Sequence, residues 1–262
     1  MDSGASARIA QLVVNAGVSK SATSSVAAHT RVRVVEIGPG TGELTRALLD
    51  AGCDVTAIDV DPDMIRILRS REDLHGAHIA EADALAFDFQ TFAAGLPWRM
   101  TGNLPYNLAT PLIMRLVEMR NGPEALVVMV QKEVAQRFAA QPGSKAYGSL
   151  SVATQYAMEV HREFTLGPGA FYPRPKVDST VVSLVRRGAP AVRTADEHWF
   201  LQVVRAAFAY RRKTLVNSLS LSLGLTRASV TDVLQQLDLD TEIRGEQLSL
   251  ERFAQIADRL RT

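Results

Sequence analysis

The sequence is poor in cysteine, in metal-ligand patterns and in long apolar runs, and each shortage excludes a class of protein. Cys53 is the only cysteine among 262 residues, so the chain can form neither a disulfide framework nor a cysteine-based metal site. The five histidines lack the spacing of zinc ligands, and we expect no metal. No apolar run reaches the roughly 18 residues that a membrane span requires. These shortages favour a cytoplasmic protein that does not bind membranes.

The formal net charge is only +1, but the charges are unevenly distributed. Residues 1–99 carry 9 Lys and Arg against 13 Asp and Glu, whereas residues 100–262 carry 20 against 15. An excess of positive charge suits contact with a polyanion such as nucleic acid. The second part of the chain is therefore the candidate for such contact.

Apolar runs alternate with helix-like segments through the first half of the chain. This alternation predicts a parallel, doubly wound sheet. The predicted strands are 33–37, 54–59, 77–81, 99–103 and 125–130. Later strands are expected near Phe164 and over 181–185, and the pattern from Glu197 onward is helical. Gly188-Ala189-Pro190 marks a boundary, which predicts a catalytic domain at 1–187 and a helical domain at 188–262.

A glycine-rich turn follows the first predicted strand, at Gly38, Gly40 and a third glycine two positions later. Such a turn lets the backbone pass close to a ligand and directs a helix N-terminus towards it. Glu36, Asp59 and Asp83 lie at the ends of successive strands, where carboxylates can accept from an ammonium, a ribose or an adenine amine. Any one of them could instead be a solvated strand end. Together they suit S-adenosylmethionine (SAM), which carries all three groups and no phosphate.

Asn103, Leu104, Pro105 and Tyr106 follow the fourth predicted strand and form the central stretch of the site. The Asn103 side chain and the Leu104 backbone oxygen can both accept hydrogen bonds from one planar amine. Those bonds would localise the amine lone pair towards a methyl donor, so that transfer depends mainly on positioning. Proline stiffens the turn, and stacking of a base on Tyr106 would contribute about 1–3 kcal/mol. The alternative interpretation is a loop that simply starts a helix.

Two further groups of side chains could hold nucleic acid. A base must be unpaired or extruded to enter such a pocket, and Phe171 is a candidate for its second stacking face. Phe171 could equally be a hydrophobic plug under the proline-rich loop. Arg211, Arg212 and Lys213 are adjacent cations on a segment predicted to be helical. They form either a solvated face or a site for RNA phosphates, which would bind in a salt-dependent way.

Four motifs occur in order along the chain: EIGPGTG at 36–42, GNLPYN at 102–107, FYPRPKVDS at 171–179 and RRKTL at 211–215. Their combination resembles the KsgA-type ribosomal RNA adenine dimethyltransferases, also called RsmA. The resemblance implies a Rossmann-like α/β sheet of the SAM-dependent methyltransferases with a small C-terminal all-helical domain. It implies transfer of two methyls to each of two adjacent adenosines near the 3′ end of 16S rRNA. The implied substrate is the immature 30S subunit, and the implied enzyme is a monomer.

By the same resemblance, Gly38, Asp59, Asp83 and Asn103 would contact SAM, and Asn103 and Tyr106 would hold the adenine. The sequence departs from the family in two places. Asp59 stands where Glu is usual, and we expect the shorter acid still to reach the ribose. Family members also carry a Gly-Gln-(Asn/His)-Phe-Leu segment before the part resembling residues 2–17, and the printed sequence lacks it. That segment helps to close the pocket, so we expect weak SAM binding that upstream residues would improve.

Three other functions remain open from the sequence. An Erm-type enzyme, which methylates large-subunit rRNA, shares the catalytic motifs, although the motifs at 171–179 and 211–215 favour the KsgA type. DNA and protein-glutamine methyltransferases use an Asn-Pro-Pro-Tyr-like loop, but neither class explains the second half of the chain. The protein could also be a ribosome-assembly factor whose catalysis is reduced because the N-terminal segment is missing.

Overall fold

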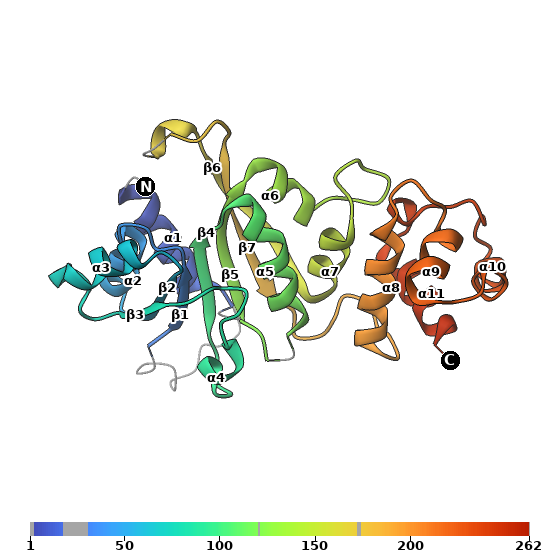
Figure 1. The fold of residues 1–262 in the computed structure, drawn as a ribbon, viewed down its shortest axis with the longest axis horizontal. Coiled ribbons are helices and arrows are strands. Elements are labelled where there is room, and N and C mark those ends of the chain that lie inside the picture. Colours follow the sequence, from blue (N-terminus) through green and yellow to red (C-terminus); the bar gives the residue numbers. More distant parts are fainter. Residues whose placement is uncertain (1–2, 18–30, 120, 172–173, 262) are drawn as a thin grey trace. The chain divides into compact units, whose positions relative to one another are not determined.

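The computed structural model describes residues 3–17, 31–119, 121–171 and 174–261. It divides into two compact units (Figure 1). The first comprises Met1–Ala135 and Glu159–Arg186, and the second comprises Gln136–Met158 and Arg187–Thr262. The second unit thus includes a segment that the sequence analysis assigned to the first domain, and the boundary at residue 187 stays a prediction. The loop expected at 19–30 lies outside the described residues.

The sheet of the described chain has seven strands in the order β3-β2-β1-β4-β5-β7-β6. Their bounds are β1 (Arg33–Ile37), β2 (Asp54–Asp59), β3 (His78–Glu81), β4 (Arg99–Asn103), β5 (Ala125–Gln131), β6 (Met158–Leu166) and β7 (Ser179–Arg186). The first five pair with one another in parallel. The carboxyl ends of these strands therefore meet at one edge of the sheet, where α/β proteins bind ligands.

Strand β7, for which no direction was predicted, runs antiparallel to β5 and pairs Gln131 with Ser179. A parallel partner needs a crossover connection, usually a helix of a dozen or more residues. The link from β6 to β7 contains only the short 3-10 helix η2 (Pro168–Ala170), so the chain turns back on itself. As a result, β7 starts at the edge of the sheet where β5 ends.

Helices of the first unit begin at residues that fix their first turn. The bounds are α1 (Ser3–Asn15), α2 (Glu43–Asp50), α3 (Pro62–Ser70), η1 (Glu72–Leu74), α4 (Phe89–Ala93) and α5 (Tyr106–Glu118). Asp61 caps α3 by accepting from the Asp63 amide, and Asp88 caps α4 in the same way. Pro105, with φ −63°, is the N-cap of α5, because its fixed φ suits the entry to a helix.

The two faces of the sheet are covered separately because side chains alternate along each strand. Val127 and Met129 point to the face where α1 and α2 pack, in a cluster that includes Val13 and Leu48. The intervening Leu126 and the other residues of its face are also fully buried, and α5 packs on β5. Apolar contacts on both faces of the sheet therefore stabilise the strands whose carboxyl ends meet at the ligand-binding edge.

The second unit is built of helices. Its elements are α7 (Ser149–Ala157), α8 (Glu197–Ala209), α9 (Leu215–Leu223), α10 (Arg227–Gln236), η3 (Gly245–Gln247) and α11 (Leu250–Leu260), and α6 (Lys132–Phe138) leads into it. Thr214 and Ser249 each cap a helix by accepting from an amide three residues on. The expected helical C-terminal part is confirmed. None of the described helices is long and apolar enough to cross a membrane.

Candidate active site

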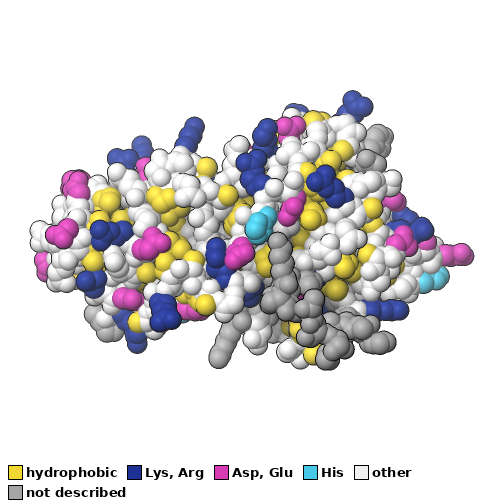
Figure 2. Space-filling model, turned by 180° about the vertical axis from the view of Figure 1, so that it is seen from behind, with side chains coloured by type: hydrophobic (Ala, Val, Ile, Leu, Met, Phe, Trp, Pro, Cys, Tyr) yellow, Lys and Arg dark blue, Asp and Glu magenta, His cyan; other side chains and the backbone are white. Residues whose placement is uncertain are grey.

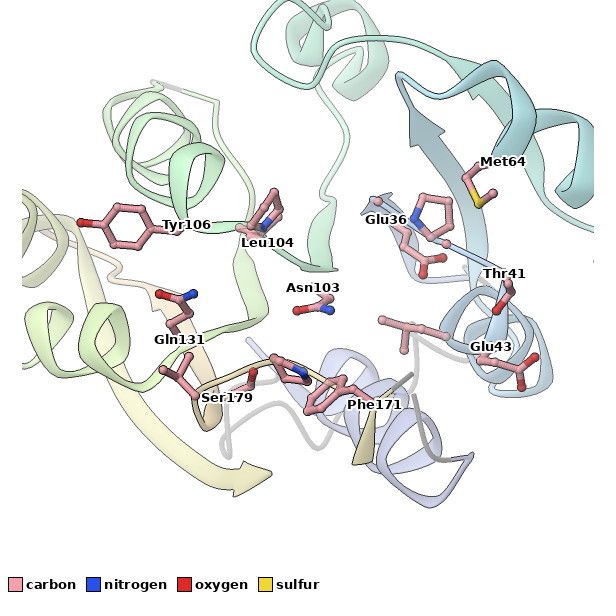
Figure 3. A pocket seen from close by; sticks show the side chains of 17 residues that line it. Glu36, Thr41, Glu43, Met64, Asn103, Leu104, Tyr106, Gln131, Phe171 and Ser179 are labelled. Atoms are coloured by element: carbon pink, nitrogen blue, oxygen red, sulfur yellow. The ribbon is translucent and has the colours of Figure 1, made fainter. Parts of the chain in front are cut away.

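A pocket of about 490 Å³ opens at the carboxyl edge of the parallel strands in the first unit (Figure 3). It is lined by Glu36, Gly38, Pro39, Gly40, Thr41, Glu43, Leu44, Met64, Asn103, Leu104, Pro105, Tyr106, Gln131, Phe171, Pro175, Val177 and Ser179. The pocket brings together the glycine turn, the Asn103 stretch and Phe171, which are far apart in the sequence. These three groups of predicted site residues therefore share one cavity.

The glycine turn joins β1 to α2 and forms one wall. Gly38, Gly40 and Gly42 have φ values of 65°, 56° and 90°, a left-handed conformation that residues with a Cβ rarely adopt. The first amides of α2 consequently face the pocket edge. The Arg71 guanidinium donates to the Thr41 carbonyl oxygen and forms an ion pair with Glu43 at 3.0 Å. This arginine holds the turn in place from outside the pocket.

Glu36 is the buried acid of the site. Its side chain is only 1% exposed, and it accepts a hydrogen bond of 2.6 Å from the Thr45 hydroxyl. Burial raises the pKa of the Glu36 carboxyl to about 7, although the hydrogen bond from Thr45 opposes the rise. A carboxylate that is costly to ionise in the empty pocket is stabilised by a cation placed beside it. Glu36 is thus suited to an ammonium ligand.

Asp59 and Asp83 lie at the same edge of the sheet but do not line this pocket. Asp59 ends β2, and its Oδ1 accepts from the Asp61 amide at 3.0 Å. Asp83 follows β3, and its Oδ1 accepts from the Leu85 amide at 2.8 Å. Within the described residues, neither Oδ2 has a hydrogen-bond partner, so each can accept from a ligand. Val60 and Leu85, which are 62% and 42% exposed, place apolar surface beside these acids.

Asn103 ends β4 and projects its amide into the middle of the pocket (Figure 3). Its neighbour Leu104 is buried and donates its amide to the Met129 carbonyl oxygen at 2.9 Å, which fixes the backbone of the stretch. Tyr106 begins α5 and is 53% exposed, with its ring directed away from Asn103 (Figure 3). The open ring could receive a base, and its stacking role stays a prediction.

Gly102 determines how closely β4 approaches β1. A Cβ at this position would overlap the backbone carbonyl oxygen of Ile37, the last residue of β1. Gly38 lies just beyond, and a Cβ there would stand 3.8 Å from the Asn103 carbonyl oxygen. The missing side chain of Gly102 thus allows β1 and β4 to lie next to each other at the pocket floor, whereas a Cβ at Gly38 would make only an ordinary contact.

Phe171 enters the pocket from the loop between β6 and β7. It also packs against the apolar cluster of α1, α2 and the sheet. Both interpretations of Phe171 are consistent with this placement, and its contact with a base stays a prediction. Tyr172 and Pro173, part of the same motif, lie outside the described residues.

The sequence analysis missed several pocket residues, of which Gln131 is the most informative. Gln131 ends β5 as Asn103 ends β4, and its amide points into the pocket (Figure 3). It makes no hydrogen bond to another side chain of the described residues. The sequence feature that could have identified Gln131 as a site residue is its position as a polar residue at the end of a predicted parallel strand. Ser179 could not be found in this way, because it reaches the pocket only through the antiparallel pairing of β7.

The three cations of the second unit lie in a turn and not on a helix, contrary to the prediction. Helix α8 ends at Ala209, Thr214 caps α9, and residues 210–213 between them form a turn. Arg211, Arg212 and Lys213 are all exposed. Arg211 donates to the Lys145 carbonyl oxygen at 3.0 Å. On the face shown in Figure 2, cationic and anionic side chains are interspersed.

The chain is similar to known proteins over most of its length. The family model described as ribosomal RNA adenine dimethylase matches residues 9–261. The chain belongs to this family. The ribosomal RNA small subunit methyltransferase A of Lactococcus lactis subsp. lactis (strain IL1403) is 41% identical over 246 residues, 91% of this chain and 83% of that protein.

Solved structures of related enzymes have the same architecture. A dimethyladenosine transferase from Plasmodium falciparum superposes with a TM-score of 0.73 at 25% identity, covering 97% of this chain and 94% of that one. The 23S rRNA methyltransferase ErmE superposes with a TM-score of 0.68 at 23% identity, covering 100% and 99%, and it shares the fold. The predicted family, the methyltransferase fold and the SAM cofactor are therefore confirmed.

The side chains of this dimethylase fit SAM. The cofactor would place its ammonium against the Glu36 carboxylate and its methionine part against the backbone of the glycine turn, which has no Cβ to obstruct it. Asp59 and Asp83 supply free carboxylate oxygens for the ribose and the adenine amine. SAM carries a methyl group on a cationic sulfur, and the chain contributes acids around that cation. The individual contacts stay predictions.

Proposed function

We propose that the protein transfers methyl groups from SAM to the N6 amines of two adjacent adenosines near the 3′ end of small-subunit rRNA. The proposed substrate is the immature 30S subunit, and the enzyme would act as a cytoplasmic monomer. Membership of the ribosomal RNA adenine dimethylase family supports the reaction, and the relatives named small subunit methyltransferase A support the substrate. The position of the Asn103 amide, in one pocket with Glu36 and the glycine turn, carries the proposal.

The chemistry follows from two hydrogen-bond acceptors. The lone pair of an adenine amine is delocalised into the ring, so the amine is a weak nucleophile. If its two protons are held by the Asn103 side-chain oxygen and the Leu104 backbone oxygen, the lone pair is directed out of the ring plane. The nitrogen then forms a bond to the methyl carbon as the carbon–sulfur bond breaks with its electron pair left on sulfur, and the nitrogen releases one proton to solvent for each methyl. Positioning of this kind lowers the activation barrier by several kcal/mol.

Substitution of Asn103 tests this mechanism. We expect Asn103→Ala to lower kcat for methylation of immature small subunits by about 10²–10³-fold, the usual effect of removing one preorganised polar contact from an active site. Because Asn103 is also predicted to contact SAM, the Kd of S-adenosylhomocysteine (SAH) is measured for this variant, so that weaker cofactor binding can be separated from the loss of transfer. The matched control is Asn121→Ala, which removes an exposed amide after α5 and should keep full activity. Mass mapping of the methylated adenosines measures both.

The same assay separates the competing functions. Methylation of large-subunit RNA in place of small subunits would indicate an Erm-type enzyme. If Asn103→Ala binds immature subunits as wild type does while losing methylation, binding and catalysis are separable roles, as an assembly factor requires. Full methylation by Asn103→Ala would contradict the mechanism.

A further inference from the structure

The loop that carries Asp83 is held by a residue from a distant helix. Asp83 follows β3, and its backbone oxygen accepts from the amides of Ala86 and Phe87 at 3.0 and 2.8 Å. This tight turn leaves the carbonyl oxygens of the following residues pointing out of the loop. A backbone oxygen without a partner is costly when it is removed from water, so these oxygens need a donor.

Arg115 of α5 supplies that donor. Its Nη1 donates to the carbonyl oxygens of Ala84 and Leu85 at 3.2 and 2.7 Å. Its Nη2 donates to the carbonyl oxygen of Phe87 at 2.9 Å. The guanidinium also lies over the Phe89 ring, 5.2 Å from the centroid. Three backbone oxygens and one aromatic ring thus hold the Arg115 guanidinium, whose planar arrangement of N–H donors can reach all three oxygens at once.

One of these contacts acts directly on the Asp83 carboxylate. The carbonyl of Ala84 and the amide of Leu85 belong to the same peptide plane. Arg115 binds the oxygen end of this plane, and the N–H end donates to Asp83 Oδ1 at 2.8 Å. A hydrogen bond at one end of a peptide unit polarises it and strengthens the bond at the other end. The guanidinium therefore sets the orientation of the plane, and the plane sets the orientation of the carboxylate.

The opposite end of α5 lies in the pocket. The helix begins at Tyr106, directly after the Asn103 stretch, and Arg115 stands nine residues further along, about 14 Å at the rise of an α-helix. The buried side chains of Leu112, Ile113 and Leu116 seat this helix in the core. One rigid element therefore connects the amine-holding stretch to the loop of Asp83.

We propose that Arg115 is a positioning residue for the methyl donor: it orients the Asp83 carboxylate towards the adenine amine of SAM without touching the cofactor. This inference rests on the proposed contact between Asp83 and that amine. It extends the site to a residue of α5 that the sequence motifs do not include. It also means that α5 acts on both reaction partners: its start follows the stretch predicted to hold the target base, and Arg115 near its end acts on the cofactor adenine through Asp83.

The test measures recognition of the amine and needs no catalysis. The Kd values of SAH and of its analogue lacking the purine amine are compared by calorimetry. A hydrogen bond to a charged acceptor corresponds to about a tenfold preference for SAH in the wild type. We expect Asp83→Ala to abolish the preference and Arg115→Met to reduce it to about twofold. A general loss of stability would weaken both ligands equally and leave the ratio unchanged.

Arg69→Met is the matched control. Arg69 lies on α3 and donates to the Ile79 carbonyl oxygen of β3 at 3.1 Å, so the same substitution removes the same kind of contact near the same strand. This variant should keep the roughly tenfold preference for SAH over the analogue that lacks the amine. If Arg115→Met does not fold, Arg115→Lys takes its place, because a lysine cannot span the three carbonyl oxygens and should also lower the ratio.

The outcomes separate this inference from the proposed role of Asp83. A preference that Asp83→Ala abolishes and Arg115→Met retains would overturn the inference alone. If the wild type binds SAH and the analogue equally, Asp83 does not recognise the purine amine, and the inference about Arg115 fails with it. Loss of the preference in Arg69→Met as well would show a general effect of disturbing β3 and would also overturn it.

Discussion

Among single residues, Glu36 has the most unusual surroundings. Its carboxyl is buried, with Thr45 as its side-chain partner, whereas exposed Asp73 lies between two arginines that hold its pKa well below the usual range. Desolvation raises an acid's pKa and a nearby cation lowers it. The raised pKa of Glu36 means that the ionised form destabilises the empty protein as the pH rises through about 7. A cationic ligand removes that cost.

A proton should therefore leave Glu36 when a ligand with an ammonium binds. At pH 7 the free carboxyl is about half protonated, because its pKa is about 7, so SAH binding should release close to half a proton. The sign follows: SAH affinity rises with pH up to about 7.5 and then levels off, and it falls as the pH drops to 6. Calorimetry in buffers of different ionisation enthalpy measures the release. Glu36→Gln should abolish it, and an unchanged release in this variant would refute the assignment.

At the scale of elements, strands are easier to predict than their directions. The bounds of β1 and β4 were predicted correctly, because short apolar runs end there in glycine or in Asn103. The antiparallel direction of β7 was missed, because the apolar pattern of a strand does not encode its direction. Ser179 was missed for the same reason, since its proximity to Gln131 depends on the β5–β7 register. Helix α5 begins directly after the Asn103 stretch, because Pro105 already caps it.

The close approach of β1 and β4 predicts the effect of a side chain at Gly102. In Gly102→Ala the new Cβ must displace the Ile37 carbonyl oxygen, and the strands must separate. We expect a loss of about 1–3 kcal/mol in the free energy of unfolding, as for other overpacked sites, together with weaker SAH binding. Urea denaturation and calorimetry measure the two effects. Gly167→Ala is the control, because a Cβ there meets nothing within 4 Å; equal stability of the two variants would contradict the argument.

At the scale of the whole molecule, many arginines bind the protein's own backbone. Arg33 donates to carbonyl oxygens at the end of α4, Arg99 to those at the end of α1, and Arg186 to those at the end of α5. Arg187 does the same for α7. Cations at helix C-termini are stabilised by the helix dipole. Counting charges along the sequence therefore overstates the positive charge available to RNA, and the exposed turn at 211–213 becomes a stronger candidate for binding it.

This turn should determine how RNA binding responds to salt. Replacing Arg211, Arg212 and Lys213 by Ala should weaken binding to small-subunit RNA. The slope of log K against log salt should fall by about 0.7 for each phosphate that the variant no longer neutralises. Because the turn is far along the chain from the pocket residues, SAH affinity should stay at the wild-type value. Filter binding at several salt concentrations measures the slope. Arg227→Ala, an exposed cation at the start of α10, serves as the control and should leave it unchanged.

The reversed direction of β7 has a consequence for changing what the enzyme modifies. Because β7 starts where β5 ends, the connection over residues 167–178 delivers Phe171, Pro175 and Val177 to the pocket as one contiguous peptide. The cofactor wall comes from other strands. If Phe171 contacts the target base as predicted, this peptide can be exchanged by loop grafting or a focused library between two fixed strand ends, while the residues predicted to hold SAM keep their sequence. New acceptor specificities should be sought there first.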